Sequence, residues 1–182
     1  MDVANSSHGA VKGTPSPFDW FFLGSLALAL CGVMWVGVVA YEEGQKVETV
    51  KRHGEAWGQF FTSKTAARAQ ESFEPAACAA GAEAKTTWGG CYQALVAPGG
   101  ALDGLKNPFS LAPQKVTSCK FGGLGTAGEL MLEKLVSTPP GAPVPFIAEP
   151  LLETDAIHQK MHIRVTICDK GGNPIRVGEF DF

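Results

Sequence analysis

The stretch Trp20–Tyr41, WFFLGSLALALCGVMWVGVVAY, decides the fold, because it contains no charged residue over 22 positions. At about 1.5 Å per residue, a helix of this length spans roughly 33 Å, which exceeds the bilayer's hydrocarbon thickness of about 30 Å. Aromatic residues at its two ends suit the headgroup boundary. The alternative is a buried helix of a soluble protein, but core helices of this length usually keep a polar face. The segment is therefore predicted to cross a membrane once.

Beyond this segment, four large apolar residues recur at steps that place them on one face of a helix: Val47, Val50, Trp57 and Phe61. Charged residues occupy the remaining surface, so the pattern predicts one long helix from about Phe18 to Ala69. We expect it to end before Pro75, because a residue that precedes proline resists helical geometry. The stripe is a candidate helix interface. It packs on the helix's own domain, on neighbouring subunits, or on both along its length.

The C-terminal end of the chain predicts a β-hairpin. Residues 161–168 alternate apolar and polar side chains, a Gly-rich turn follows, and residues 174–182 return as a second strand. Gly178 is expected to mark a β-bulge, since the apolar residues on its two sides are out of phase. We also expect a short helix over 87–96, a strand over 115–121 and a proline-rich extended loop over 137–150. Residues 129–136 suit either a helix or a strand.

These elements predict four parts of the chain. Residues 1–19 form an N-terminal tail or leader, 20–41 a transmembrane helix, 42–73 an amphipathic extension of that helix, and 74–182 an extracytoplasmic domain. The predicted fold class is α+β, with a long N-terminal helix followed by a small antiparallel β-sheet domain that contains disulfides. A cleaved secretory signal is the alternative for the apolar segment, but its run exceeds the roughly 7–15 residues of such signals.

Cysteine usage predicts two disulfides. One of the five cysteines, Cys31, lies inside the apolar segment, and an even set of four remains in the domain: Cys78, Cys91, Cys119 and Cys168. An even set in a small domain beyond a hydrophobic segment is typical of disulfides in an oxidising compartment. Four cysteines allow three connectivities. We consider first the pairing of Cys78 with Cys91 and of Cys119 with Cys168.

The orientation in the membrane rests on two arguments that disagree. The cysteines place the C-terminal domain outside the cytoplasm. The basic residues nearest the segment, Lys12 before it and Lys46, Lys51 and Arg52 after it, place that domain inside. We follow the cysteines, because the charge bias is small. The predicted topology is a single pass with an extracytoplasmic domain.

No residue cluster in the sequence indicates catalysis. The net charge of −3 and the absence of a basic cluster with interleaved aromatic residues do not fit nucleic-acid binding. His158 and His162 are four apart, but in a strand that spacing separates them by roughly 13 Å. We therefore expect no enzyme activity, metal, cofactor or small-molecule substrate. The expected partners are the lipid bilayer and other membrane or filament subunits.

The layout of a hydrophobic helix, an amphipathic extension and a disulfide-bearing sheet resembles the type IV pilin and pseudopilin family. Members carry a short leader that ends in glycine and is cut by a dedicated peptidase, and they have an acidic residue near the start of the apolar stretch. The matching residues here are Gly13, as the leader cleavage position, and Asp19, as the assembly carboxylate. Asp19 departs from the family pattern, since it stands six positions after Gly13 rather than five and is not glutamate.

The resemblance implies a membrane-anchored structural or assembly subunit that packs through its long N-terminal helix. It also implies that the membrane is the bacterial inner membrane. In the family, the acidic residue pairs with the N-terminal amine of a neighbouring subunit during assembly. The alternative function is a bitopic accessory subunit of a larger membrane complex, with a periplasmic binding or stabilising domain.

Overall fold

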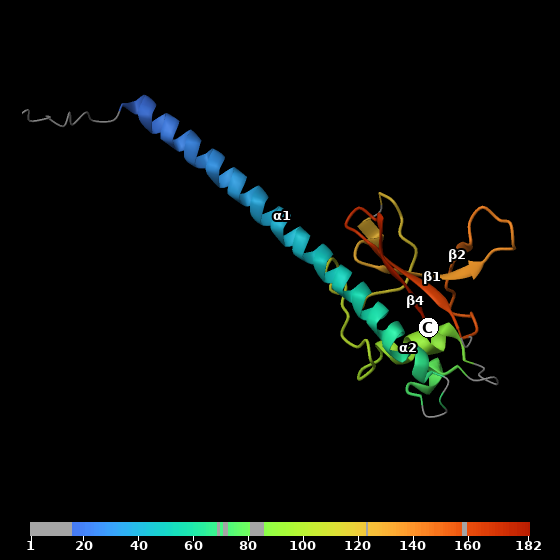
Figure 1. Cartoon of the computed structure of the whole chain (residues 1–182). Coiled ribbons are helices and arrows are strands. Elements are labelled where there is room, and N and C mark those ends of the chain that lie inside the picture. Colours follow the sequence, from blue (N-terminus) through green and yellow to red (C-terminus); the bar gives the residue numbers. More distant parts are fainter. Residues whose placement is uncertain (1–15, 69, 71–72, 81–85, 123, 158–159) are drawn as a thin grey trace, which may run out of the picture. The chain divides into compact units, whose positions relative to one another are not determined.

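The computed structural model describes residues 16–68, 70, 73–80, 86–122, 124–157 and 160–182 (Figure 1). The chain divides into two units, Met1–Glu42 and Glu43–Phe182, and each is described by itself. Gly13 and His158 lie outside the described residues.

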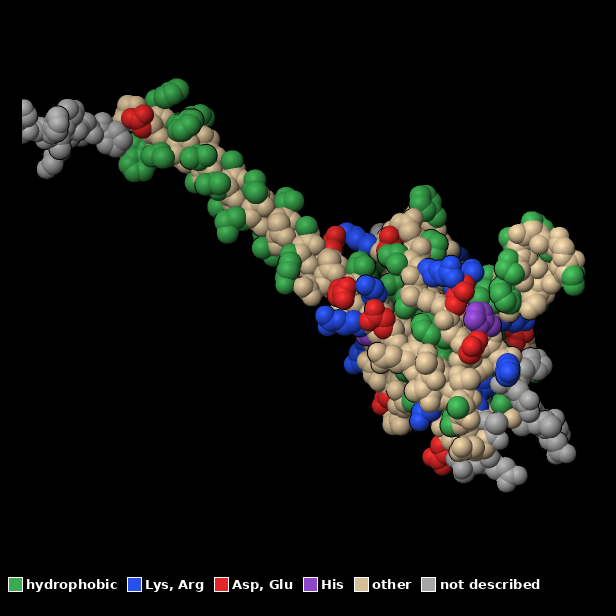
Figure 2. Space-filling model, in the orientation of Figure 1, with side chains coloured by type: hydrophobic (Ala, Val, Ile, Leu, Met, Phe, Trp, Pro, Cys, Tyr) green, Lys and Arg blue, Asp and Glu red, His purple; other side chains and the backbone are tan. Residues whose placement is uncertain are grey.

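The long helix α1 extends over Pro17–Lys64, and a 3₁₀ turn over Thr65–Ala67 follows it. The predicted continuous helix is thus present, with its last turn tightened. Part of α1 is long and apolar enough to cross a membrane, with a mean hydropathy of 2.2 over 18 residues that are not buried. The exposed hydrophobic side chains of this part are visible in Figure 2.

The second unit contains one antiparallel sheet with the strand order β2-β1-β3-β4. Its strands are β1 (Leu130–Ser137), β2 (Phe146–Pro150), β3 (His162–Cys168) and β4 (Pro174–Asp181). The fold class is therefore α+β, and the C-terminal hairpin is confirmed. Val165 pairs with Gly178 whereas Thr166 pairs with Arg176, so Val177 is the extra residue of the predicted bulge. The ambiguous segment 129–136 is the central strand β1.

Two predictions about the domain are wrong. Residues 115–121 form no strand, because only Val116 makes an isolated bridge, to Leu130 at the start of β1. The segment 137–150 is not loop throughout, because its last five residues form β2. A strand at the edge of a sheet needs ladder hydrogen bonds on one side only, which is why β2 tolerates Pro150.

The core of the second unit lies between α1 and the sheet. Five aromatic side chains form its centre: Trp57, Phe60, Phe61, Trp88 and Phe182. The rings of Phe61 and Phe182 are 4.9 Å apart, and Arg68 lies 3.8 Å above the Phe182 ring. Close approach of α1 to β4 depends on two glycines of the helix. A Cβ at Gly54 would lie 2.7 Å from Val177, and one at Gly58 would lie 2.3 Å from Phe180.

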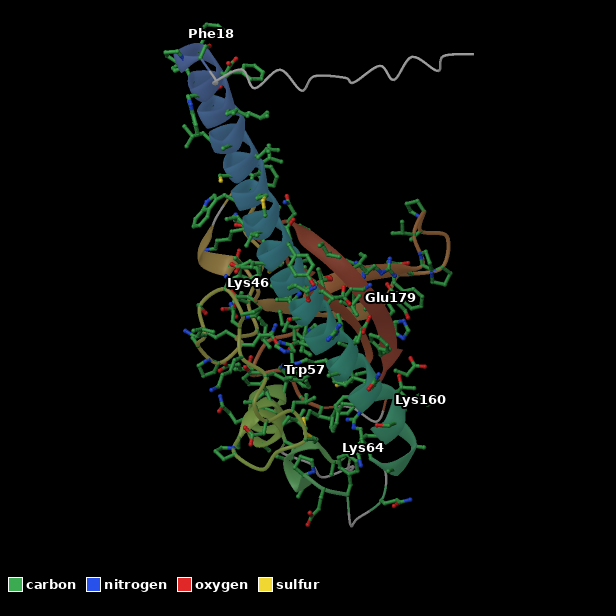
Figure 3. All side chains as sticks on the ribbon, turned by 90° about the vertical axis from the view of Figure 1, so that its left-hand side faces the viewer. Phe18, Lys46, Trp57, Lys64, Lys160 and Glu179 are labelled. Atoms are coloured by element: carbon green, nitrogen blue, oxygen red, sulfur yellow. A yellow bond between two sulfur atoms is a disulfide. The ribbon has the colours of Figure 1, made fainter. Side chains whose placement is uncertain are left out.

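The apolar stripe of α1 faces this core. Val50, Trp57 and Phe61 are 1%, 2% and 0% exposed, and Val47 is half-buried. Figure 3 shows the labelled Trp57 on the part of α1 that runs through the domain. The three buried side chains have no area left for neighbouring subunits, which corrects that half of the interface prediction. The helix packs these residues on its own domain.

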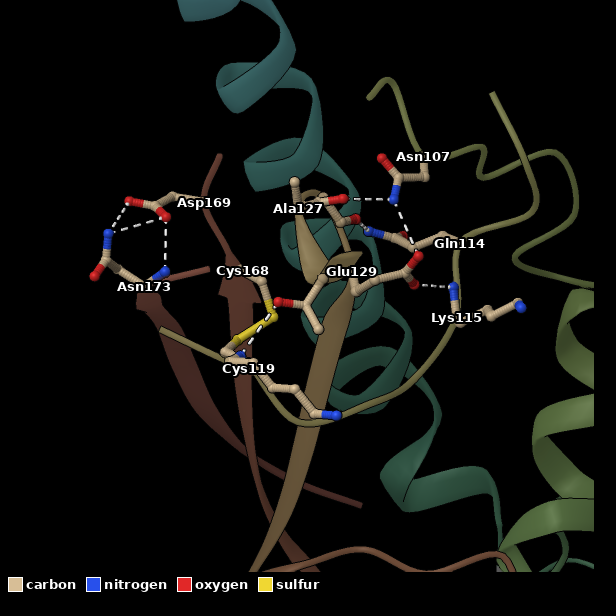
Figure 4. The surroundings of a disulfide bond; sticks show 12 residues. Asn107, Gln114, Lys115, Cys119, Ala127, Glu129, Cys168, Asp169 and Asn173 are labelled. Atoms are coloured by element: carbon tan, nitrogen blue, oxygen red, sulfur yellow. Dashed lines mark hydrogen bonds between the residues drawn. A yellow bond between two sulfur atoms is a disulfide. The ribbon is translucent and has the colours of Figure 1, made fainter. Parts of the chain in front are cut away.

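Both disulfides have the pairing considered first. Cys78–Cys91 joins the 3₁₀ turn Ala76–Cys78 to the helix α2 (Trp88–Val96). Cys119–Cys168 joins the segment after Val116 to the end of β3 (Figure 4). The predicted short helix is thus confirmed as α2, and the Thr87 side chain caps it by accepting a hydrogen bond from the Gly90 N–H. Cys31, which is exposed on α1, is a free thiol.

Candidate functional site

The part of α1 between Phe18 and Tyr41 exposes an extensive apolar surface. Its large side chains are exposed all around the helix; Leu28 and Trp35, for example, are 77% and 74% exposed. Soluble monomers rarely expose contiguous apolar patches beyond a few hundred Å². A surface of this kind is typical of segments that contact lipid or other proteins.

Asp19 stands at the start of this surface and has a local role. Its Oδ2 accepts a hydrogen bond of 2.7 Å from the backbone N–H of Ser16, and its own N–H donates to Ser16 Oγ at 3.3 Å. This reciprocal pattern is a capping box, with Pro17 at the first helical position. The carboxylate therefore fixes where α1 begins. Its predicted role in assembly stays a prediction.

Charged side chains form a network across the face of the sheet opposite α1. Arg164 on β3 lies between Glu133 on β1, at 3.8 Å, and Glu179 on β4, at 2.9 Å. Asp181 Oδ1 lies 2.6 Å from His162 Nδ1, whose ring stacks on Phe146. These contacts are cross-strand pairs that bind the strands together.

The network perturbs the acidity of Glu179. Burial is the largest single effect and raises its pKa, but the hydrogen bond from Arg164 and the charges of Arg176, Arg164 and His162 together lower the pKa more, so it falls below its ordinary value. Within the described parts of the chain, no three His, Cys, Asp or Glu side chains gather closely enough to hold a metal ion.

A buried polar network lies beside the second disulfide (Figure 4). The carboxylate of Glu129, which is 8% exposed, accepts hydrogen bonds from Asn107 Nδ2 at 3.1 Å and from the backbone N–H of Lys115 at 2.5 Å. Gln114 Nε2 donates to the Gly128 carbonyl at 2.8 Å. Burying these groups requires such partners. The network thereby fixes the loop of residues 107–115 onto the start of β1.

This fixed loop forms one wall of a cavity of about 310 Å³ in the second unit. The cavity is lined by residues of α1, α2, the two loop segments 98–106 and 113–116, and β1: Trp57, Tyr92, Val96, Pro98, Leu102, Asp103, Gly104, Leu105, Lys106, Pro113, Gln114, Lys115, Val116 and Leu130. Burial raises the pKa of Tyr92, and the charges of Glu129 and Glu153 raise it further. The sequence contained no signal for this cavity, because its walls come from five separate segments.

His53 lies next to the loop wall. Burial lowers its pKa, and the neighbouring Gln114 side chain raises it by a smaller amount. The two side chains interact, although among the described residues neither His53 Nδ1 nor Gln114 Oε1 completes a hydrogen bond of ordinary geometry. The imidazole is therefore favoured in its neutral form.

Comparisons with protein-family models, curated proteins and solved structures found no match to this chain. The structure brings together the members of each cysteine pair, and it places Cys78, Cys91 and three of the four stripe residues in the core of the second unit. Asp19 belongs to the first unit.

Proposed function

We propose that this protein is a membrane-anchored structural or assembly subunit of the pilin-like kind. The observation that carries the proposal is the difference in burial between the two parts of α1. Its N-terminal part exposes large apolar side chains on every side, whereas its C-terminal part contributes Val50, Trp57 and Phe61 to the core of a disulfide-bonded domain. One helix thus serves as a membrane anchor and as a core helix of the domain.

Packing with other subunits is assigned to the N-terminal part of α1, since the stripe beyond Tyr41 is used by the domain itself. Bundled helices pack through van der Waals contacts in a bilayer, and small residues such as Gly24 and Gly32 permit close approach. The two disulfides support an extracytoplasmic domain, because such bonds persist in oxidising compartments. The inner membrane of a bacterium is the location that fits this layout.

The test is the intact mass of the protein from its native membrane, with and without reduction and alkylation, together with a sheared-surface fraction. A mass that lacks residues 1–13, two disulfides and recovery in the sheared fraction would support the pilin-like proposal. Four free thiols in the domain would refute the extracytoplasmic location. A full-length mass with two disulfides and no sheared material would refute the filament role and favour an accessory subunit.

The accessory-subunit function is the second candidate, and the capping box at Asp19 favours it. A carboxylate with a local helix-capping role needs no partner amine to explain it. Asp19→Asn keeps an acceptor oxygen for the cap and removes the charge, whereas Asp19→Ala removes both. A subunit that needs the charge for assembly fails with both variants. One that needs only the cap tolerates Asp19→Asn.

A further inference from the structure

We propose that the cavity in the second unit binds a small amphipathic anion, specifically an aliphatic carboxylic acid of medium chain length. Its volume of about 310 Å³ is at the lower end of the roughly 300–1,000 Å³ that small-molecule sites occupy. Such a volume suits a short acyl chain rather than a whole membrane lipid. The assignment is independent of the proposed function, since every lining residue lies in Glu43–Phe182.

The inner walls of the cavity are apolar. Most of its lining residues carry hydrocarbon or aromatic side chains: Trp57, Tyr92, Val96, Leu102, Leu105 and Val116 among them. An acyl chain placed here removes apolar surface from water, which is the main source of affinity in such sites.

The walls of the cavity are held in place by contacts among the lining residues themselves. The Trp57 and Tyr92 rings stack at 5.9 Å with 10° between their planes. The Tyr92 hydroxyl donates to the Gln114 carbonyl at 3.1 Å, and the Gln114 N–H donates to the Leu105 carbonyl at 3.1 Å. A site that is already formed binds its ligand without the cost of ordering its walls.

The charges of the lining favour an anionic head group. Lys106 and Lys115 are exposed, and among the residues that the structure describes neither ammonium group pairs with a carboxylate. The Lys115 side chain extends away from the Glu129 carboxylate, which its backbone N–H contacts (Figure 4). The acidic residue of the lining, Asp103, accepts a hydrogen bond of 2.9 Å from the Gly99 N–H. The charged residues of the lining are two cations and one anion, and Glu129 and Glu153, whose charges act on Tyr92, stand outside the lining. The net positive charge of the lining itself attracts a single negative charge.

The experiment uses the full chain in nanodiscs and two photoreactive probes, decanoic acid and decanol with the same diazirine group on the chain. After irradiation, the labelled peptides are identified by mass spectrometry. Partition into the bilayer labels residues 17–41 with both probes and is not saturable. We expect decanoic acid, in addition, to label residues 92–116 in a saturable way, and we expect unlabelled decanoic acid to compete.

Two variants and one control sharpen this test. Val116→Trp fills the cavity and is expected to abolish labelling of residues 92–116. The double variant Lys106→Glu/Lys115→Glu changes only exposed side chains, and it should weaken the binding of decanoic acid by about tenfold, since each exposed charge pair is worth at most roughly fivefold and two pairs together at most roughly 25-fold. Lys120→Glu alters an exposed lysine outside the lining and should change nothing.

Three results would overturn the assignment. Labelling confined to residues 17–41 shows that the cavity takes no acyl chain. Equal labelling of residues 92–116 by the acid and the alcohol, unchanged by the lysine variant, excludes an anionic head group. If Lys120→Glu weakens the binding of decanoic acid as much as the double variant does, the overall charge of the domain attracts the acid rather than the two lysines of the lining.

Discussion

Replacing Gly58 by alanine is expected to destabilise the domain, even though alanine forms helices better than glycine does. A Cβ at this position would lie 2.3, 2.6 and 2.8 Å from three atoms of the Phe180 ring. Helix propensity favours alanine by about 1 kcal/mol. Overpacking of a core costs about 1–3 kcal/mol, and contact with three ring atoms indicates the upper end of that range. The expected net loss is therefore about 1–2 kcal/mol of the free energy of unfolding.

Gly44 provides a matched control in the same helix, since a Cβ there would meet nothing within 4 Å. Gly44→Ala is therefore expected to raise the free energy of unfolding by about 0.5–1 kcal/mol. Urea denaturation of the full chain in detergent, followed by tryptophan fluorescence, measures both variants. With a urea m-value of about 2 kcal/mol/M, in the middle of the usual range, Gly58→Ala should lower the midpoint by roughly 0.5–1 M.

A double variant decides whether the Phe180 ring is the cause. Gly58→Ala/Phe180→Leu removes the ring atoms that the new methyl group would meet, so its loss should be smaller than the sum of the two single losses by at least about 0.5 kcal/mol. The close approach of α1 to β4 is refuted if Gly58→Ala raises the midpoint as Gly44→Ala does. It is also refuted if the two substitutions are additive.

Three further results are expected. Cys119→Ser should lower the free energy of unfolding by about 4 kcal/mol, because its bridge to Cys168 spans a sequence separation of 49; an unchanged melting temperature would contradict this. The folded pKa of Glu179 is lowered, so its stabilisation is present above the ordinary value of 4.5 and is lost as the pH falls through the folded pKa. Glu179→Gln should therefore reduce the fall in melting temperature below pH 4.5, and an identical acid profile would speak against the pair with Arg164. Trp57→Asp puts a carboxylate where the side chain is 2% exposed, so the domain should lose its resistance to proteolysis, and a resistant variant would show that the stripe is not core.

The elements that the sequence predicts well are those set by local patterns. The uncharged run Trp20–Tyr41 and the stripe beyond it predict a single helix, and α1 extends over Pro17–Lys64. Alternation along residues 161–168 predicts a strand, because side chains of a strand point to opposite faces in turn. Gly178 correctly indicates the bulge, since the phase of the apolar residues changes there. These signals depend on neighbours within a few positions.

The edges of the sheet and the partners of each surface depend on distant residues. Proline suggests loop at Pro150, yet an edge strand uses its ladder bonds on one side only, so β2 forms there. Residues 115–121 have the composition of a strand, but they form only one isolated β-bridge, with Leu130 of β1. The segment then continues to the disulfide at Cys119. A local sequence pattern does not predict how many strands will pair with a segment.

The sequence by itself determined that this chain has an apolar helix, an amphipathic continuation, a C-terminal hairpin and four cysteines able to pair. Only the tertiary structure decided what covers the stripe, which cysteines meet, why Gly54 and Gly58 must be small, and where a cavity remains. The physical reason is that burial is a property of two surfaces. The residue type alone shows that a side chain is apolar. The residues that cover it come from elsewhere in the chain and are known only from the fold.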